Sequence, residues 1–375
     1  MRQHLLRGIF ALVIIAACSS VLTLGFNDFA QYWVASRQVL TGHNPYSLHE
    51  TIRAETALGN GGPGVILNPP WIIPLLVPLG FLSYAAAQKI WFAINFAALL
   101  LSAELSGRVY APRMSPLRGW LLIFTFLPAM TCVAVGQMTA LALLSIAGFA
   151  YFAAQKRWVA AGACLFLATL KPQLAYLLWP ALFFWTVADV RRRWKLTGTT
   201  VLLIVAGSLA AFLLDPAVFS QYGRLWFHEK NMQEVFPTLA GALRVIFGAQ
   251  RRWLQVVPAV GALGWLVWYG RRIKQWNWTQ TTPLLVAVSL ATAPYGWYFD
   301  EIVLWPGILR VLVQRRWTAI AAYIALNIAN AAMIFTHRTT FWYSWTAPAW
   351  LIFYVFAVKE SAGAVRENTS SQNQA

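Results

Sequence analysis

The chain has 375 residues, of which 59% are hydrophobic and only 11% are charged, and its formal net charge is +17 at pH 7. A soluble domain carries about 25% charged residues, and its core is too small to enclose this much apolar surface. The composition therefore excludes an ordinary soluble fold and predicts an all-α polytopic membrane protein. Its positive charge is expected to set orientation and contact lipid headgroups, with no nucleic acid as partner.

The first predicted element is a transmembrane helix at 8–26. Arg2 and Arg7 precede an apolar run that resembles a signal peptide, and Cys18 ends a sequence that mimics a lipoprotein cleavage site. The run continues to Phe26, however, which makes it longer than the apolar region of a cleaved signal. We therefore expect this segment to remain in the membrane as the first span.

Eleven further apolar runs are predicted to cross the bilayer, since about 20 apolar residues suffice for a spanning helix. These runs are 66–83, 85–105, 137–153, 158–170, 173–188, 197–214, 253–270, 281–297, 302–314, 317–335 and 342–358. Another apolar stretch, 118–135, is predicted to enter and leave on one side as a re-entrant or broken helix. Only then do the strongest basic clusters, near Arg157, Arg192, Arg272 and Arg315, share the cytoplasmic side.

This arrangement places both chain ends in the cytoplasm and the polar segments 27–65 and 215–252 outside. Nine of the 12 acidic residues then lie on the outer side, where chemistry is expected. Three basic residues, Arg108, Arg113 and Arg118, also fall outside, contrary to the positive-inside rule. We expect one transmembrane domain at 1–360, in the cell membrane, and a disordered cytoplasmic tail at 361–375.

The first outer segment begins with Asp28 and reaches a turn at Gly42-His43-Asn44-Pro45. The amphipathic stretch between them predicts a short helix at the membrane interface. Asp28 at its start is either a helix N-cap or a general base at the edge of a low-dielectric cavity.

Two amides lie beside predicted helix breaks. Asn68 precedes Pro69-Pro70, which suits the first turn of a helix, and its side chain is expected to point into a cavity. Gln137 follows Gly136 after the re-entrant stretch. Its amide either satisfies loose backbone groups or contacts a ligand.

Lys171 interrupts two apolar runs and is followed by Pro172. A lysine between spans is costly unless it reaches the headgroups or meets a partner. It therefore either snorkels outward or neutralises a phosphate held near the outer leaflet, with Pro172 breaking the helix at that point.

Asp300 and Glu301 follow Pro294-Tyr295-Gly296-Trp297 at another predicted helix junction. The two carboxylates either pair with a basic group or bind substrate. A metal site is not expected, because two carboxylates offer too few ligands. The histidines His43, His49, His228 and His337 are scattered, and the segment 215–252 is a candidate lining for an acceptor.

Taken together and in this order, the motifs resemble glycosyltransferase family 87, the polyprenyl-phosphate-mannose-dependent α-1,2-mannosyltransferases. The matching pieces are Asp28 to Tyr32, Gly42 to Tyr46, Asn68-Pro69-Pro70, Gly136-Gln137, Gly162 to Lys171 and Pro294 to Trp297. The resemblance implies a GT-C fold of about 12 transmembrane helices with an active site on the outer face. Many members carry a His pair after the Trp, whereas this chain has Phe299 and Asp300, so Asp300 must replace that His function or leave it unfilled.

The resemblance also implies the substrates. The donor is expected to be a polyprenyl-phosphate hexose, with mannose favoured, and the acceptor a hydroxyl of a glycolipid or glycan, with no cofactor and no metal. Asp28 corresponds to the family's catalytic carboxylate. The residues expected to bind the substrates are Tyr32, Arg37, Tyr46, Asn68, Gln137, Lys171, Gln173, Trp297 and Asp300.

The expected mechanism is a single displacement. Asp28 takes the proton of the acceptor hydroxyl, which attacks the anomeric carbon in line with the departing phosphate, so that the anomeric centre inverts. Positive charge is needed where negative charge develops on the phosphate. Lys171 is the first candidate for that charge, followed by Arg37 or Arg224.

Three other hypotheses remain open. A transporter or lipid flippase favours ionisable residues at mid-membrane and repeated halves, and neither feature is evident. An assembly subunit without chemistry predicts that Asp28→Asn keeps its function. Transfer of an arabinosyl, glucosyl or phosphoryl group would use the same kind of site.

Overall fold

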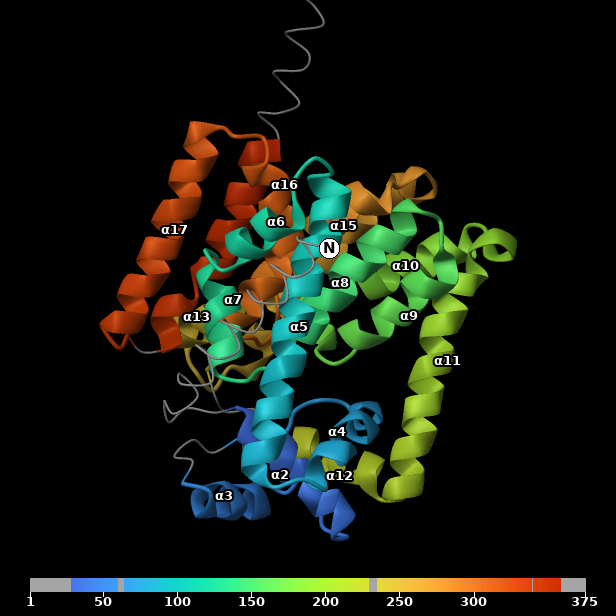
Figure 1. Ribbon diagram of the computed structural model, residues 1–375, viewed down its shortest axis with the longest axis vertical. Helices are drawn as coiled ribbons and strands as arrows, with labels where there is room; N and C mark the ends of the chain where they lie inside the picture. The colour runs from blue at the N-terminus through green and yellow to red at the C-terminus, as the bar shows by residue number, and fades with distance from the viewer. Residues whose placement is uncertain (1–27, 60–63, 229–234, 339, 359–375) are drawn as a thin grey trace, which may run out of the picture.

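The computed structural model describes residues 28–59, 64–228, 235–338 and 340–358, and every regular element within these ranges is a helix (Figure 1). The prediction of an all-α fold is therefore confirmed for the described part of the chain. The predicted first span at 8–26 and the predicted tail at 361–375 lie outside the described residues.

The α-helices are α2 (Phe29–Leu40), α3 (Leu48–Ala57), α4 (Ile73–Gly80), α5 (Tyr84–Tyr110), α6 (Pro116–Ile123), α7 (Leu127–Ala134), α8 (Thr139–Ala154), α9 (Trp158–Ala168), α10 (Leu178–Val187), α11 (Val190–Leu214), α12 (Val218–His228), α13 (Leu239–Phe247), α14 (Val257–Tyr269), α15 (Trp278–Ala291), α16 (Trp305–Leu312) and α17 (Trp317–Phe335). Short 3-10 helices are η2 (Pro70–Ile72), η3 (Pro172–Ala175), η5 (Arg252–Gln255), η6 (Gly270–Gln275), η7 (Tyr298–Leu304) and η8 (Thr340–Tyr343). A last helical segment runs over Phe341–Val358.

Four helical segments of the described chain are long and apolar enough to cross a membrane, namely α5, α11, α17 and Phe341–Val358. The 25 residues of α11 reach about 37 Å, which exceeds the roughly 30 Å hydrocarbon core of a bilayer. Its apolar side chains point outward, and Leu202 and Leu213 are 65% and 73% exposed. Apolar surface of this length and exposure is expected to be solvated by lipid, so the protein is embedded in a membrane.

The other predicted spans correspond to shorter helices, so the predicted number of twelve spans is not confirmed. The helices α8, α9, α10, α14, α15 and α16 have between 8 and 16 residues each. The apolar stretch 118–135 forms α6 and α7, which meet at a 76° bend. This bend agrees with the prediction of a broken or re-entrant element.

The predicted span at 66–83 does not cross the molecule. It folds as η2, which packs on α11, and α4, which packs on α2. Ser36 Oγ donates to Leu76 O at 3.1 Å and Trp33 Nε1 donates to Leu82 O at 3.2 Å. Its prolines break the long helix that its hydropathy predicts. In Figure 1, α2, α4 and α12 lie together at the lower end.

Because 66–83 does not cross, α5 begins at this end and runs to the opposite one (Figure 1). The Tyr84 ring stacks on Phe29 at 5.8 Å, whereas the Tyr110 hydroxyl donates to Thr279 O at 2.9 Å. The basic residues Arg108, Arg113 and Arg118, expected on the outer side, therefore lie at the end that carries the other basic clusters. The stretch 118–135 accordingly starts at the basic end of the molecule, whereas the prediction started it at the opposite end.

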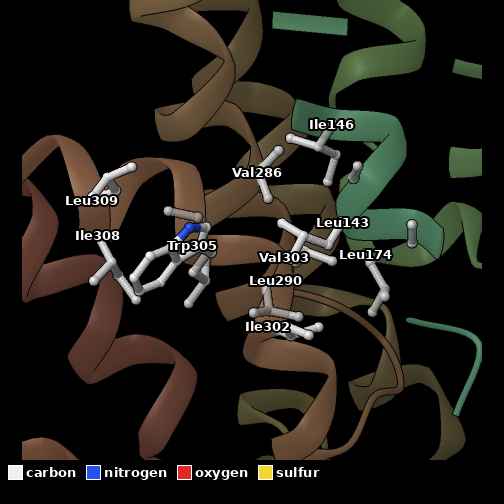
Figure 2. Packing of buried hydrophobic residues seen from close by; sticks show 14 of the residues in the cluster. Leu143, Ile146, Leu174, Val286, Leu290, Ile302, Val303, Trp305, Ile308 and Leu309 are labelled. Carbon is white, nitrogen blue, oxygen red and sulfur yellow. The ribbon is translucent and has the colours of Figure 1, made fainter. Parts of the chain in front are cut away.

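Two clusters of buried apolar residues form the core. The larger one lies between α8, α15, η7 and α16, and Figure 2 shows Leu143, Val286, Val303 and Trp305 packed within it. The smaller one lies under α2 and α4 and ends at Met138 and Leu170. Polar residues between the two clusters form the candidate site.

Candidate active site

The site lies where three pairs of helices are interrupted. The chain leaves helical geometry between α7 and α8, between α9 and α10 around η3, and between α15 and η7. Non-helical backbone at membrane depth is tolerated only where it is buried in protein or lines a polar cavity. These three breaks meet the start of α2, and this junction holds the buried charged and polar side chains described below.

The first break is built by Gly136. Its φ of 74° is left-handed, a conformation that glycine adopts without a Cβ penalty. The N–H of Gly136 bonds Val133 O at 3.1 Å and the N–H of Gln137 bonds Cys132 O at 3.0 Å, which is the Schellman pattern of helix termination. This turn ends α7 and aims the Gln137 side chain at the start of α2.

Gln137 joins two residues of the first outer segment. Its Nε2 donates to Asp28 Oδ2 at 2.9 Å, and its Oε1 accepts from the Tyr32 hydroxyl at 2.6 Å. Both Tyr32 and Gln137 are buried. The position of Gln137 predicted that its amide either satisfies loose backbone groups or contacts a ligand. In the structure, both ends of the amide bond protein side chains.

Asp28 occupies the N-cap position of α2, but its side chain makes no capping hydrogen bond. Its backbone N–H donates to Val135 O at 2.8 Å, which ties it to the same turn as Gln137. Burial raises the pKa of the Asp28 carboxyl, and the bond from Gln137 and the charge of Lys171 partly offset this rise. The N-cap interpretation is therefore wrong for the side chain, and the carboxylate is held inside the protein with raised basicity.

Lys171 is buried and does not snorkel. Its Nζ lies 2.7 Å from Asp300 Oδ1, and both side chains are at least nine-tenths buried. Asp300 Oδ1 also accepts from Thr139 Oγ1 at 2.6 Å, and Oδ2 accepts from the Trp297 N–H at 3.0 Å. Of the roles open to Asp300, pairing with a basic group is the one observed, and it links all three helix breaks.

Asn68 contacts the protein. Its side-chain Nδ2 donates to Leu170 O at 2.6 Å, and its backbone carbonyl accepts from the Tyr46 hydroxyl at 2.9 Å. Asn68 and Tyr46 thus fasten the first outer segment and the start of η2 to the residue before Lys171. The Nδ2 end of the Asn68 amide is therefore bonded to the protein, and the expectation that this side chain points into a cavity stays a prediction.

Gln173 and Trp297 lie at the second and third breaks. The Gln173 Oε1 atom is buried and accepts no hydrogen bond from any described residue. The Trp297 ring stacks on Phe299 at 6.1 Å and meets Phe236 edge-on at 6.3 Å. The Gln173 Oε1 atom and part of the Trp297 ring are therefore not engaged by the observed contacts.

The two arginines proposed as reserve cations lie elsewhere. Arg37 is exposed, donates to Gly80 O at 3.1 Å and covers the Trp33 ring at 5.7 Å, so it supports the end of α4. It follows Tyr32 by five residues, which rotates it to another face of α2. Arg224 is exposed on α12 and bonds Ser220.

Two site residues were missed by sequence reasoning. Thr139, the first residue of α8, donates to Asp300, but nothing in an apolar helix marks one threonine as special. Glu301 was expected, with Asp300, either to pair with a basic group or to bind substrate, and its contacts to the C-terminal span were missed. It points away from the ion pair and accepts from Thr346 and from Trp350 Nε1, so it anchors the C-terminal span.

The second outer segment reaches the third break through aromatic rings. Tyr46 contacts Tyr222 at 5.1 Å, and Trp226 contacts Tyr295 at 5.6 Å. Across the described residues, no group of three or more His, Cys, Asp or Glu side chains is arranged to hold a metal ion.

Comparison with known proteins gives one match. The family model of glycosyltransferase family 87 matches residues 67–294, which is more than half of the chain. No curated protein sequence matches the chain, and no solved structure matches its fold. The matched segment contains the turn at Gly136 and the lysine at 171, and it ends at Pro294, within the third break.

Proposed function

The chain belongs to glycosyltransferase family 87, and we propose that it moves a hexose, first of all mannose, from a polyprenyl-phosphate donor to a hydroxyl of a glycolipid or glycan. Membership makes the protein a membrane glycosyltransferase. The finer proposal adds a GT-C arrangement, a position in the cell membrane with both termini cytoplasmic, and a site open to the outer face. The observation that carries it is Asp28, a half-buried carboxylate that is oriented by Gln137 and stabilised by the charge of the buried Lys171.

Asp28 acts as the general base. The acceptor hydroxyl gives its proton to Asp28 while its oxygen bonds to the anomeric carbon. The bond from that carbon to the phosphate oxygen breaks, and its electron pair leaves with the phosphate. The raised pKa of Asp28 supports this role, because a more basic carboxylate takes a proton more readily.

Lys171 stabilises the departing phosphate. Its ammonium group has three N–H donors, and the bond to Asp300 uses one of them. The remaining donors are available to phosphate oxygens where negative charge develops. Asp300 then holds the lysine in place, while Arg37 and Arg224, which lie on other surfaces, are left out of the chemistry.

Groups around the three helix breaks recognise the sugar. The unpartnered Gln173 Oε1 is an acceptor for a sugar hydroxyl. The partly exposed Trp297 ring presents an apolar face with a polar edge, which suits a sugar ring. Tyr46 is fully buried and bonds Asn68, so it supports the site from behind. Asn68, Tyr32 and Gln137 have their hydrogen bonds inside the protein and shape the site from behind.

The test is sugar transfer in proteoliposomes from a panel of polyprenyl-phosphate sugars, comparing wild type with Asp28→Asn. Wild-type transfer from one donor identifies the sugar, and loss of the base is expected to lower the rate roughly 10²- to 10⁴-fold. A fully active Asp28→Asn variant would remove the base from the mechanism. A wild type that transfers nothing from any donor would contradict the polyprenyl-phosphate proposal.

A further inference from the structure

Tyr32, Gln137 and Asp28 form a directional chain of hydrogen bonds. The Tyr32 hydroxyl donates to Gln137 Oε1 at 2.6 Å, and Gln137 Nε2 donates to Asp28 Oδ2 at 2.9 Å. We propose that Gln137 and Tyr32 are positioning residues, which orient the carboxylate of Asp28 rather than bind a substrate. This inference rests on the proposed role of Asp28 as the base.

The direction of the chain follows from its last member. An ionised carboxylate can only accept, so Asp28 takes a hydrogen bond from the amide nitrogen of Gln137. The amide oxygen of Gln137 then faces Tyr32 and accepts the proton of its hydroxyl. Both ends of the amide are thus bonded to protein side chains, and the donor that Gln137 gives Asp28 favours the ionised form of that carboxylate.

Asp28 and Gln137 are both held by one turn. Asp28 donates its backbone N–H to Val135 O at 2.8 Å, and Trp91 Nε1 donates to Gly136 O at 2.7 Å. Gly136 at a left-handed φ leads directly into Gln137. The base and the group that orients it thus move as one unit, even though 109 positions separate them along the chain.

This geometry gives the two carboxylate oxygens of Asp28 different roles. Oδ2 is occupied by Gln137, and within the described residues no side chain is seen donating to Oδ1. Oδ1 is then the atom that takes the proton of the acceptor hydroxyl. A carboxylate held by one fixed donor presents its second oxygen in a constant direction, which lowers the entropy that must be lost in reaching the transition state.

Several charged or titratable groups face Asp28 besides Gln137. They are Lys171 and Asp300 at the other two breaks, Tyr32 on α2, Cys132 on α7, Glu55 on α3 and Tyr298 on η7. None of these six residues donates a hydrogen bond to the Asp28 carboxylate, so Gln137 is the group whose removal changes its protonation most directly. Removing that donor destabilises the ionised form and moves protonation to higher pH.

The experiment measures kcat and KM for donor and acceptor across pH in proteoliposomes, for wild type, Gln137→Met and Tyr32→Phe. Methionine has nearly the shape of glutamine without its hydrogen bonds. We expect Gln137→Met to lower kcat roughly 10- to 100-fold, to leave both KM values almost unchanged, and to move the acid limb of the rate profile to higher pH. Tyr32→Phe removes a single oxygen and is expected to act in the same direction but less strongly.

The matched control is Gln155→Met, an exposed glutamine after α8 whose amide bonds only Tyr151 O, and it is expected to behave as wild type. A raised KM with an unmoved acid limb in both site variants would show that Gln137 and Tyr32 bind a substrate, which overturns the inference. An active Asp28→Asn variant would instead overturn the proposed base itself, so the two failures are distinguishable.

Discussion

Lys171 and Asp300 form a buried ion pair with Nζ and Oδ1 only 2.7 Å apart, although 129 positions separate them in the chain. Asp300 also accepts from Thr139 and from the Trp297 backbone, so one carboxylate holds together the starts of α8 and η7 and the break after α9. In the position where many family members carry histidine, this chain therefore has a carboxylate that fixes the lysine.

The first prediction concerns the two sides of this pair. Removing one partner of a buried pair leaves an uncompensated charge, so Lys171→Met is expected to destabilise the protein by about 3–5 kcal/mol. The double variant Lys171→Met with Asp300→Asn is expected to recover much of this loss, because no charge is left buried. Thermal unfolding in detergent measures the stability of all four members of the cycle.

Activity measurements on the same four proteins separate the structural role of Lys171 from its chemical role. If Lys171 stabilises the leaving phosphate, the double variant stays inactive even where its stability is restored. Recovery of transfer together with stability would show that Lys171 serves the fold alone.

The sequence alone identified Asp28, Lys171 and Asp300 as candidates, because a charged residue next to apolar runs requires a partner or a function. It did not identify their partners, since an ion pair or an amide bridge between distant segments depends on tertiary packing. The error at 66–83 has a different origin. Hydropathy does not distinguish an apolar stretch packed on protein from one that faces lipid, although Pro70, Pro74 and Pro78 recur every four residues and argue against a long helix.

The error at 66–83 also produced the one violation of the positive-inside rule. When 66–83 is not counted as a crossing, the direction of α5 is reversed. Arg108, Arg113 and Arg118 then lie at the same end as the other basic clusters. The misplaced charges were therefore a valid signal that the predicted number of crossings was wrong. The same signal identified neither which run failed to cross nor the side from which α6 and α7 enter.

The second prediction is the pH dependence of transfer. A base must be ionised, and the pKa of Asp28 is raised above its ordinary value of 3.8 by burial. The rate kcat/KM is therefore expected to fall as pH decreases through a value above 3.8. An acid limb at or below the ordinary aspartate value would contradict the environment described for Asp28.

The third prediction concerns the turn before Gln137. Alanine at Gly136 would have to adopt a left-handed φ of 74°, which costs about 1–2 kcal/mol. Gly136→Ala is also expected to lower transfer strongly, because relief of this strain moves the Gln137 side chain away from Asp28. Gly261 on α14 has open space around it, so Gly261→Ala is the control and should keep both stability and activity.

The fourth prediction concerns Glu55 on α3, which accepts the Gly64 N–H at 3.1 Å. Burial raises the pKa of its carboxyl to about 7, from an ordinary value of 4.5. Between these values the folded protein binds more protons than the unfolded chain, so stability declines as pH rises from about 4.5 to about 7. Glu55→Gln should flatten this decline and raise the melting temperature at pH 8. An unchanged pH profile of the melting temperature would argue against a buried Glu55 carboxyl with a raised pKa.

The fifth prediction tests which segments share a side of the membrane. His49 on α3 lies at the end of α2 and α4, whereas Arg113 and Gln155 lie at the opposite end, and all three side chains are exposed. Single cysteines at these positions, in a variant whose native cysteines are replaced by alanine, report their side through labelling of intact cells by an impermeant maleimide. Because the end with Arg113 and Gln155 holds the basic clusters, the positive-inside rule places it in the cytoplasm.

We therefore expect His49→Cys to be labelled in intact cells, and Arg113→Cys and Gln155→Cys only after the membrane is permeabilised. Labelling of Arg113→Cys together with His49→Cys would restore the crossing at 66–83 and contradict the path of α5. The reverse pattern, with Arg113→Cys and Gln155→Cys labelled from outside, would keep the fold but turn the protein over. The segment with Asp28 would then lie on the cytoplasmic side, and the donor would have to be presented there.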